Sequence, residues 1–348
     1  MFGVLIAGHE AGHFGVAKLF GIRVNEFSVG MGPALLSRQK GETRYSLRLL
    51  PFGGYCAIEG EDGESEDPRA FSKKPLLCRL GVLAAGSAAN LLIGFLIALI
   101  IYFGYGLSGR YSVANTTLAG FMEGFPLESS DGLLEGDRIV SVNGWRVHST
   151  RDFSLFMSVN TEDTVDLVIR RDGQRITLED FPLTLREYSD GSGNTVLRYG
   201  LYFCSEPLTV FTAVREALWD CAYYARVVWV SLGCLLNGQA GLNDLSGPVG
   251  MVKAIGEAGA DAESVSEGLG NVFTLIAFIA VNLAVMNLLP LPALDGGHIF
   301  SALLLAAMEK LFHRKPNPKI ENAVHAVGLF LLLGLMVFVM ANDIRKLF

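Results

Sequence analysis

The sequence has 348 residues, of which 51% are hydrophobic and only 18% are charged, and its formal net charge is −7. Soluble domains average about 25% charged residues, so this composition excludes a disordered chain, a coiled coil and a typical cytosolic enzyme. It predicts a membrane protein with a smaller soluble part, in contact with the lipid bilayer. The acidic balance gives no reason to expect a nucleic acid partner.

The first apolar segment, residues 1–20, contains the pattern His9-Glu10-x-x-His13. The apolar stretch before His9 is too short to cross a bilayer, which needs about 20 residues in a helix. We therefore expect either a membrane span that begins before Met1, so that the first span is truncated here, or a short half-inserted helix. The segment has neither the basic start nor the cleavage pattern of a signal peptide.

The spacing of His9 and His13 places both imidazoles on one face of a helix, one turn apart. Two imidazoles at this spacing suit a single Zn²⁺ ion, and Glu10 would lie where it can activate the attacking water. Polar side chains inside an apolar helix are costly unless they have partners, which favours a functional reading. The alternative reading is a pair of hydrogen-bonded histidines that only pack helices.

A β-hairpin is predicted between this helix and the next apolar run. Residues alternate in polarity over Thr43–Leu49 and Phe52–Ile58, around a Pro-Phe-Gly-Gly turn that contains Gly53 and Gly54. The edge of such a hairpin would pair with the backbone of an unwound substrate and satisfy its N–H groups. The alternative is a simple surface hairpin.

Three further runs without Asp, Glu, Lys or Arg are long enough to span a membrane, namely Leu80–Gly109, Gly268–Leu294 and Asn322–Asn342. With the first helix they give about four spans. Lysine and arginine are concentrated between Lys18 and Arg79 and again between His298 and Asn322. By the positive-inside rule these two loops are cytoplasmic, so the long intervening segment is extracytoplasmic.

The segment Pro207–Leu236 is also apolar, but four charged residues interrupt it. Charges at this density do not lie at the centre of a bilayer, so we expect an interfacial or packed amphipathic helix.

From about Val113 the sequence changes to runs in which apolar and polar residues alternate, as in β-strands. Strand-like runs such as Arg138–Val142 and Thr164–Ile169 are followed by Asn-Gly and Asp-Gly pairs, which are hairpin signals. A short helix is expected over Arg151–Val159. The stretch Gly132–Ile139 resembles part of bacterial PDZ domains, so residues 113–186 are predicted to form one PDZ-like α+β module that binds peptides. The alternative is a domain that merely fills space.

A zinc hydrolase needs a third protein ligand, and one distant segment is equipped to supply it. The second long apolar run ends in a stretch whose prolines and glycines must break the helix. Irregular backbone at membrane depth is tolerated only when it is buried in protein or lines a wet cavity. Asp295 at this break is the favoured ligand, because flanking glycines free it to approach a metal, and His298 is its rival.

These motifs together resemble the site-2 protease family of zinc intramembrane metalloproteases, and within it the RseP type with a single PDZ-like module. The resemblance covers essentially the whole chain. It rests on His9-Glu10-x-x-His13, on the inserted PDZ-like module, on Ser246–Gly250, and on Asn287-x-x-Pro290-x-Pro292-x-Leu294-Asp295-Gly296.

The resemblance implies that His9, His13 and Asp295 hold Zn²⁺ and that Glu10 is the catalytic base. It implies that Asn287 helps to hold the substrate or the developing oxyanion. Gly53 and Gly54 of the predicted hairpin are expected to take part in substrate or oxyanion binding. The implied activity is cleavage of the transmembrane segment of single-span regulatory proteins such as anti-sigma factors. A substrate remnant or other extracytoplasmic peptide would bind the PDZ-like module.

The predicted fold is a polytopic α-helical membrane protein with an inserted extracytoplasmic PDZ-like domain and a cytoplasmic β-hairpin. Its parts are a catalytic membrane half (1–109), the PDZ-like domain (113–186) and an amphipathic helix with a second membrane half (207–348). The expected location is the cytoplasmic membrane of a bacterium, with the active site near the cytoplasmic side. One alternative function is a non-catalytic scaffold that binds peptides; a transporter is disfavoured because no internal repeat is visible.

Overall fold

The computed structural model describes residues 2–61, 63, 65–106, 112–189, 195–239, 241, 250, 253, 265–312 and 318–346. The chain forms two compact units, one of residues 1–101 and 224–348 and one of residues 102–223. The stretch 246–249, which contributes to the family resemblance, lies outside the described residues.

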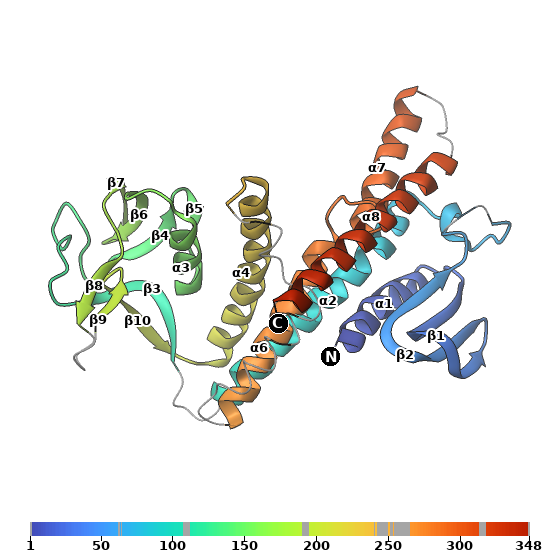
Figure 1. The fold of residues 1–348 in the computed structure, drawn as a ribbon, viewed down its shortest axis with the longest axis horizontal. Helices are drawn as coiled ribbons and strands as arrows, with labels where there is room; N and C mark the ends of the chain where they lie inside the picture. Colours follow the sequence, from blue (N-terminus) through green and yellow to red (C-terminus); the bar gives the residue numbers. More distant parts are fainter. Residues whose placement is uncertain are drawn as a thin grey trace. The chain divides into compact units, whose positions relative to one another are not determined.

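The first unit contains the apolar helices and a curved β-sheet (Figure 1). Its helices are α1 (Phe2–Leu19), the 3₁₀ turn η1 (Phe71–Lys73), α2 (Leu76–Gly106), α6 (Val265–Asn287), α7 (Asp295–Phe312) and α8 (Pro318–Arg345). Its strands are β1 (Val24–Lys40) and β2 (Thr43–Ile58). Helix α4 (Val210–Leu236) begins in the second unit and ends in the first.

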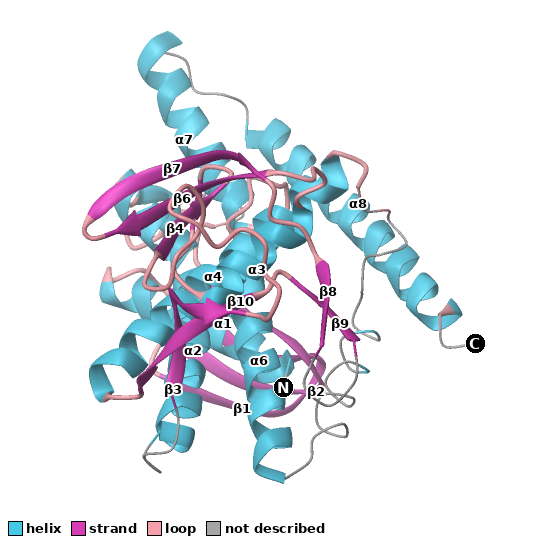
Figure 2. Ribbon diagram, turned by 90° about the vertical axis from the view of Figure 1, so that its left-hand side faces the viewer, coloured by secondary structure: helices cyan, strands magenta, loops and turns pink. Residues whose placement is uncertain are grey.

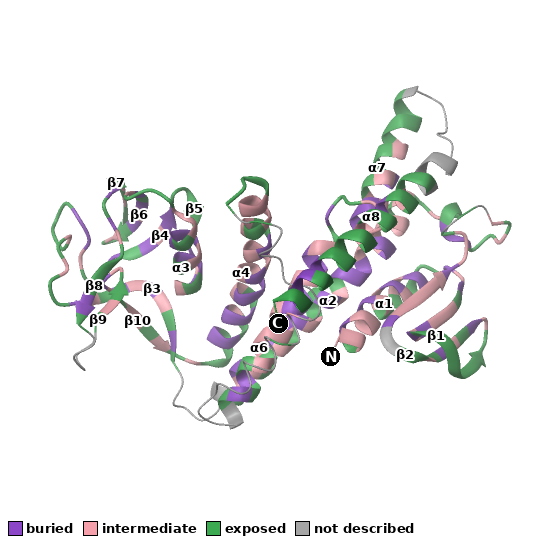
Figure 3. Cartoon of the chain, in the orientation of Figure 1, coloured by how far each residue is buried: buried purple, intermediate pink, exposed green. Residues whose placement is uncertain are grey.

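In the described parts of the chain, three helices are long and apolar enough to cross a membrane, over Leu76–Gly104, Glu267–Asn287 and Ala323–Arg345. They coincide with the three uncharged runs of the sequence. Much of α8 is coloured as exposed in Figure 3. Its exposed large apolar side chains include Phe330 and Leu331. Apolar surface of this extent is stable only when something other than water covers it, as lipid does for a membrane helix.

Helices α1 and α2 are in close backbone contact because glycines face the interface. A Cβ atom at Gly12 would overlap the carbonyl of Ala85 and lie 2.9 Å from the Cβ of Ala89. A Cβ at Gly8, one turn earlier on α1, would overlap Ile93. Small residues at such positions let helix backbones approach in a membrane, where packing and not water drives association.

The core of this unit joins α1, the sheet and the start of α2. One buried cluster consists of Ala17, Ile22, Val24, Ile58, Phe71, Val82 and Leu83. A second cluster, formed by Leu5, Ile279 and Ala280, packs α1 against α6. The first helix of the chain therefore contacts both a neighbour in sequence and a helix more than 250 residues away.

The predicted hairpin is wrong in its turn. The chain reverses at residues 41–42, where Lys40 lies opposite Thr43 and Gly41 has a φ of +63°, so β2 pairs antiparallel with β1. The Pro-Phe-Gly-Gly stretch lies inside β2. Its two flanks do not pair with each other, because both pair with β1: Val29 lies opposite Leu47 and also opposite Gly54.

The second unit is built around one sheet, with the strand order β10-β3-β4-β6-β7 and with β5 paired to β4. Figures 1 and 2 show β6 and β7 side by side as a long hairpin, with α3 beside the sheet. The elements are β3 (Ser112–Phe121), β4 (Arg138–Val142), β5 (Trp145–Arg146), α3 (Thr150–Val159), β6 (Val165–Arg171), β7 (Gln174–Phe181), β8 (Arg186–Ser189), β9 (Thr195–Arg198) and β10 (Leu201–Pro207).

The expected strands, helix and hairpin turns of this unit are confirmed. Asn143 and Gly144 both have positive φ, as do Asp172 and Gly173, which is the geometry of two-residue hairpin turns. The unit is wider than the expected range 113–186, because β10 returns to pair with β3.

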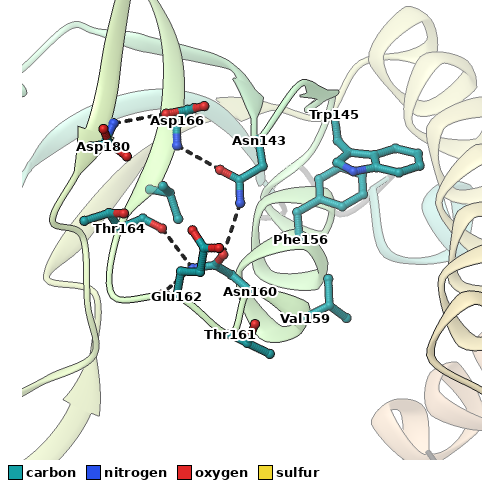
Figure 4. A pocket seen from close by; sticks show the side chains of 11 residues that line it. Asn143, Trp145, Phe156, Val159, Asn160, Thr161, Glu162, Thr164, Asp166 and Asp180 are labelled. Carbon is teal, nitrogen blue, oxygen red and sulfur yellow. Dashed lines mark hydrogen bonds between the residues drawn. The ribbon is translucent and has the colours of Figure 1, made fainter. Parts of the chain in front are cut away.

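A cavity of about 320 Å³ lies beside the Asn143 turn and the end of α3 (Figure 4). The Asn143 side chain accepts a hydrogen bond from the Asp166 backbone N–H (2.8 Å) and donates one to Asn160 (3.1 Å). Trp145 stacks on Phe156 at one wall of this cavity. None of the residues predicted to be catalytic or metal-binding lines it.

The segment expected to be an amphipathic helix is α4, and it is not among the candidate spans. The charges of its first half, Arg215, Glu216 and Asp220, have partners within the second unit. Asp220, only 8% exposed, accepts hydrogen bonds from Arg151 (2.8 Å) and from the Tyr102 hydroxyl (2.9 Å). A buried carboxylate with two such donors is a feature of a packed helix.

Candidate metal centre

The side chains of His9, His13 and Asp295 converge in the first unit, although Asp295 is 282 positions beyond His13. The two imidazole Nε2 atoms are 3.1 Å apart. The Asp295 Oδ2 atom is 3.1 Å from His9 Nε2 and 3.4 Å from His13 Nε2. Among the described residues, this is the one group of three or more His, Cys, Asp or Glu side chains close enough to share a metal ion.

A hydrogen bond to the neighbouring helix places a proton on Nδ1 of His13. Its Nδ1 lies 2.8 Å from the backbone carbonyl of Val82, which can only accept. The ring therefore carries its proton on Nδ1 and turns the lone pair of Nε2 towards His9 and Asp295. Metal-binding histidines ordinarily donate their second ring N–H in this way.

The three converging atoms fit a zinc ion. Zinc–nitrogen and zinc–oxygen bonds of about 2.0–2.1 Å in tetrahedral geometry separate neighbouring ligand atoms by about 3.3 Å, close to the observed distances. The Asp295 Oδ2 atom is buried and has no hydrogen-bond donor. Lone pairs that face one another at this range repel, so a cation between them is the arrangement that stabilises the cluster.

Asp295 reaches the histidines because the chain breaks as the sequence predicts. Helix α6 ends at Asn287 and α7 begins at Asp295, with an irregular loop between them. A Cβ at Gly296 would overlap the carbonyls of Leu288 and Leu289, and one at Gly297 would overlap that of Leu291. The two glycines therefore let α7 begin directly against the loop that precedes it.

Gly86 of α2 forms a wall of the site. A Cβ at this position would overlap His13 Nε2 and would lie 2.6–2.7 Å from the His9 imidazole. Only glycine lets the backbone of α2 lie against both rings. The contact of α2 with α1 at this point is therefore made on the two imidazole rings themselves.

Glu10 lies between the histidines and the end of β2. The backbone N–H of Cys56 faces its carboxylate. A Cβ at Gly54 would be 3.5 Å from Glu10 Cγ, so β2 runs directly past the glutamate. Gly53, with a φ of +83°, precedes it at the bend in the strand. The hairpin glycines and the predicted base therefore share one locality.

Asn287 also lies at the site, with its amide nitrogen 3.4 Å from His9 Nδ1. His298 does not join the cluster. Its ring stacks face to face on His325 of α8, with the ring centroids 3.9 Å apart. The geometry thus favours Asp295 over its rival as the third ligand.

Sequence analysis missed three groups at or beside the site: the Val82 carbonyl, the Cys56 N–H and His325. The Val82 carbonyl and the Cys56 N–H are backbone groups, so no residue pattern could have marked them. His325 carried a visible signal, because it is a polar residue near the start of an apolar run.

Comparison with known proteins agrees with this geometry. The sequence pattern that defines peptidase family M50 matches residues 1–335. A protein of Clostridium perfringens named as a zinc metalloprotease is 36% identical over 345 residues, which cover 99% of this chain and 96% of the relative. The regulator of sigma-W protease RasP of Bacillus subtilis is 27% identical, covering 100% of this chain and 97% of the relative. The zinc metalloprotease RasP of Geobacillus kaustophilus is 28% identical, with 100% and 97% covered.

The family match spans nearly the whole chain, and the matches cover 96–97% of the length of these relatives. The chain therefore belongs to peptidase family M50, the site-2 proteases, and is a zinc-dependent metalloendopeptidase.

Proposed function

We propose that the protein is an intramembrane endopeptidase that cleaves the transmembrane segment of single-span regulatory proteins such as anti-sigma factors. The observation that carries the proposal is the convergence of His9, His13 and Asp295 at the break between α6 and α7, where a candidate membrane span ends. A relative named as a regulator of sigma-W supports this substrate class.

In this proposal His9, His13 and Asp295 hold the zinc ion, and Glu10 is the general base and general acid. The bound ion supplies Lewis-acid activation of the peptide carbonyl and of water. Glu10 accepts the proton of the attacking water and delivers it to the leaving amine. The Cys56 N–H faces the Glu10 carboxylate, and Asn287 lies where its amide can donate to the substrate carbonyl oxygen.

A transmembrane helix hides its peptide bonds behind its own hydrogen bonds, so the substrate must be held extended. The stretch of β2 from Gly54 to Ile58 pairs with β1, passes Glu10, and has no second strand partner among the described residues. A substrate strand added to this edge would have its N–H and C=O groups satisfied next to the catalytic carboxylate.

We place the protein in the cytoplasmic membrane of a bacterium, with this site near the cytoplasmic face and the second unit outside. The distribution of Lys and Arg supports that orientation. The second unit is proposed to act as a PDZ-like module for a substrate remnant. Its strand β10 is an edge of the sheet, and Phe203 on this strand packs against Phe153 of α3. An edge strand beside a helix is the geometry for peptide addition.

The test is co-expression of candidate single-span anti-sigma proteins with wild-type enzyme or with Glu10→Gln, followed by immunoblotting of the substrate. We expect Glu10→Gln to abolish cleavage, with a loss of at least about a hundredfold because proton transfer is removed, while bound zinc remains stoichiometric. The matched control Glu66→Gln, made in the segment between β2 and α2, should cleave like wild type. Cleavage by Glu10→Gln would support the alternative of a non-catalytic peptide-binding scaffold for this process.

A further inference from the structure

The loop that presents Asp295 is held in a conformation that its own sequence does not favour. Ala293, two residues before Asp295, has a φ of +72°. A non-glycine residue in the left-handed region is strained, and such strain persists only when surrounding structure imposes it. Something outside the loop must therefore hold Ala293.

The contact that holds it comes from α8. The backbone N–H of Ala293 donates a hydrogen bond to Nδ1 of His325, at 3.1 Å. Since Nδ1 accepts this bond, the neutral ring carries its proton on Nε2, and that nitrogen lies 3.3 Å from the Ser301 hydroxyl of α7. One face of the His325 ring is covered by His298, whose ring stacks on it with an interplanar angle of 5°. The imidazole is thus fixed by groups on both sides of Asp295 in sequence.

A second residue of α8 touches the same loop. Gly328 is three positions after His325 and so lies on the same helix face. A Cβ at Gly328 would overlap the Cβ of Pro292 and lie 3.0 Å from its carbonyl oxygen. Helix α8 therefore meets the loop through adjacent contacts, Gly328 on Pro292 and His325 on Ala293.

The position of His325 adds weight to these contacts. It lies near the start of the candidate span Ala323–Arg345, in which most side chains are apolar. A polar side chain in such a helix costs free energy unless it has a hydrogen-bond partner, and it commonly has a functional role. Without His325, the Ala293 N–H would lose its acceptor in surroundings that offer little water.

We infer that His325 and Gly328 of α8 are positioning residues for the Asp295 ligand, acting by holding Ala293 and Pro292 of the preceding loop. His325 does not touch the ligand atoms. It fixes the backbone from which Asp295 extends, so that the carboxylate meets His9 and His13. Removing a residue that orients a metal ligand without touching the metal commonly changes metal affinity by about 10–100-fold. The inference rests on the proposed role of Asp295 as a zinc ligand.

The test uses the full-length protein in detergent and measures zinc affinity by competition with a chelator, alongside substrate cleavage. We expect His325→Leu to lower zinc affinity about 10–100-fold, because the acceptor is lost. His325→Asn should stay within about threefold of wild type, since the asparagine oxygen takes the place of Nδ1 as acceptor. Gly328→Ala should lower zinc affinity, whereas the matched control Gly334→Ala should not, because a Cβ at Gly334 meets nothing within 4 Å.

Two results would overturn the inference. The first is wild-type zinc affinity in His325→Leu, or an equal loss in His325→Leu and His325→Asn. The second is a fall in zinc affinity that only follows a lower melting temperature of the zinc-free protein, which would mean a merely structural role. Asp295→Ala separates this inference from the proposed function. If Asp295→Ala keeps zinc, the ligand role itself fails; if it loses zinc while His325→Leu keeps it, only the role of α8 fails.

Discussion

Gly86 shows how one hydrogen atom in place of a side chain shapes the metal centre. The His9 and His13 rings lie where a Cβ on Gly86 would be, so α2 closes one side of the site with backbone alone. The same helix supplies the Val82 carbonyl that fixes the proton on His13. Helix α2 thus closes one side of the site and sets the tautomer of His13, in both cases with backbone groups. A substitution at a neighbouring residue would displace these groups.

We therefore expect Gly86→Ala to be more harmful to zinc binding than to folding. The added methyl must push one imidazole away from the cluster or separate α1 from α2, and overpacking of this kind costs about 1–3 kcal/mol. Zinc content and cleavage should fall at least tenfold. The control is Gly104→Ala in the same helix, where a Cβ meets nothing within 4 Å. Full zinc occupancy in Gly86→Ala would contradict the observed packing.

At the scale of elements, the β1–β2 sheet is stabilised by a cluster around Glu26. Its Oε1 accepts hydrogen bonds from the Ser46 hydroxyl (2.6 Å) and from Arg48 (2.8 Å), and Arg48 also bonds the Tyr55 hydroxyl. Burial tends to raise the pKa of Glu26, but these hydrogen bonds outweigh it and hold the pKa below the ordinary value of 4.5. The cluster joins β1 to both halves of β2.

This pKa shift predicts how the sheet responds to acid. Because the folded-state pKa is lowered, the stabilisation by Glu26 is complete above about pH 4.5 and is lost as the pH falls through the lower folded value. Glu26→Gln should cost about 1–2 kcal/mol at neutral pH, since charge-assisted hydrogen bonds are lost. Thermal unfolding of both proteins from pH 7 to pH 3 would show a difference that is constant above pH 4.5 and narrows below it. A difference that grows in acid would contradict the assignment.

The free edge of β2 leads to a prediction about substrates. In an added strand, alternate N–H groups point at the edge and the others point away. Replacing substrate residues around the cleaved bond with proline, one at a time, should therefore block cleavage at every second position. Cleavage products resolved by mass spectrometry would reveal the period. Equal effects at all positions would argue against strand addition, because proline would then act only by altering the helix.

At the scale of the whole molecule, the zinc site ties distant segments of one unit together. Its proposed ligands come from α1 and α7, and no described residue of the second unit is among them. An ion that binds the folded state at a thousand times its dissociation constant adds about 4 kcal/mol of stability. That stabilisation should appear in the first unit alone.

Chelation should therefore loosen the two units unequally. Hydrogen exchange followed by mass spectrometry should speed up in α1 and α7 when zinc is removed, whereas the strands between Ser112 and Phe181 should exchange as before. His9→Ala, which lacks a ligand, should give fast exchange with or without chelator. Faster exchange in the strands of the second unit would show that the two units are coupled.

Much of this protein could be predicted from local sequence. The apolar runs marked the three candidate spans, and the Asn-Gly and Asp-Gly pairs marked the hairpins, because helix length and turn chemistry are local properties. The hairpin at Pro51–Gly54 was wrong for the complementary reason. Both flanks of that stretch alternate in polarity, as strands do. The tertiary structure decides which strand each flank pairs with, and both pair with β1.

The sequence by itself determined the chemistry: two histidines and a glutamate at helical spacing, and an aspartate freed by glycines where an apolar helix must break. Those features depend on residue type and spacing, which can be read directly from one sequence. Only the tertiary structure decided that Asp295 and not His298 meets the imidazoles, and that α2 and β2 supply backbone groups to His13 and Glu10. Contacts across hundreds of residues, and contacts made by backbone atoms common to every residue, leave no mark in a local pattern.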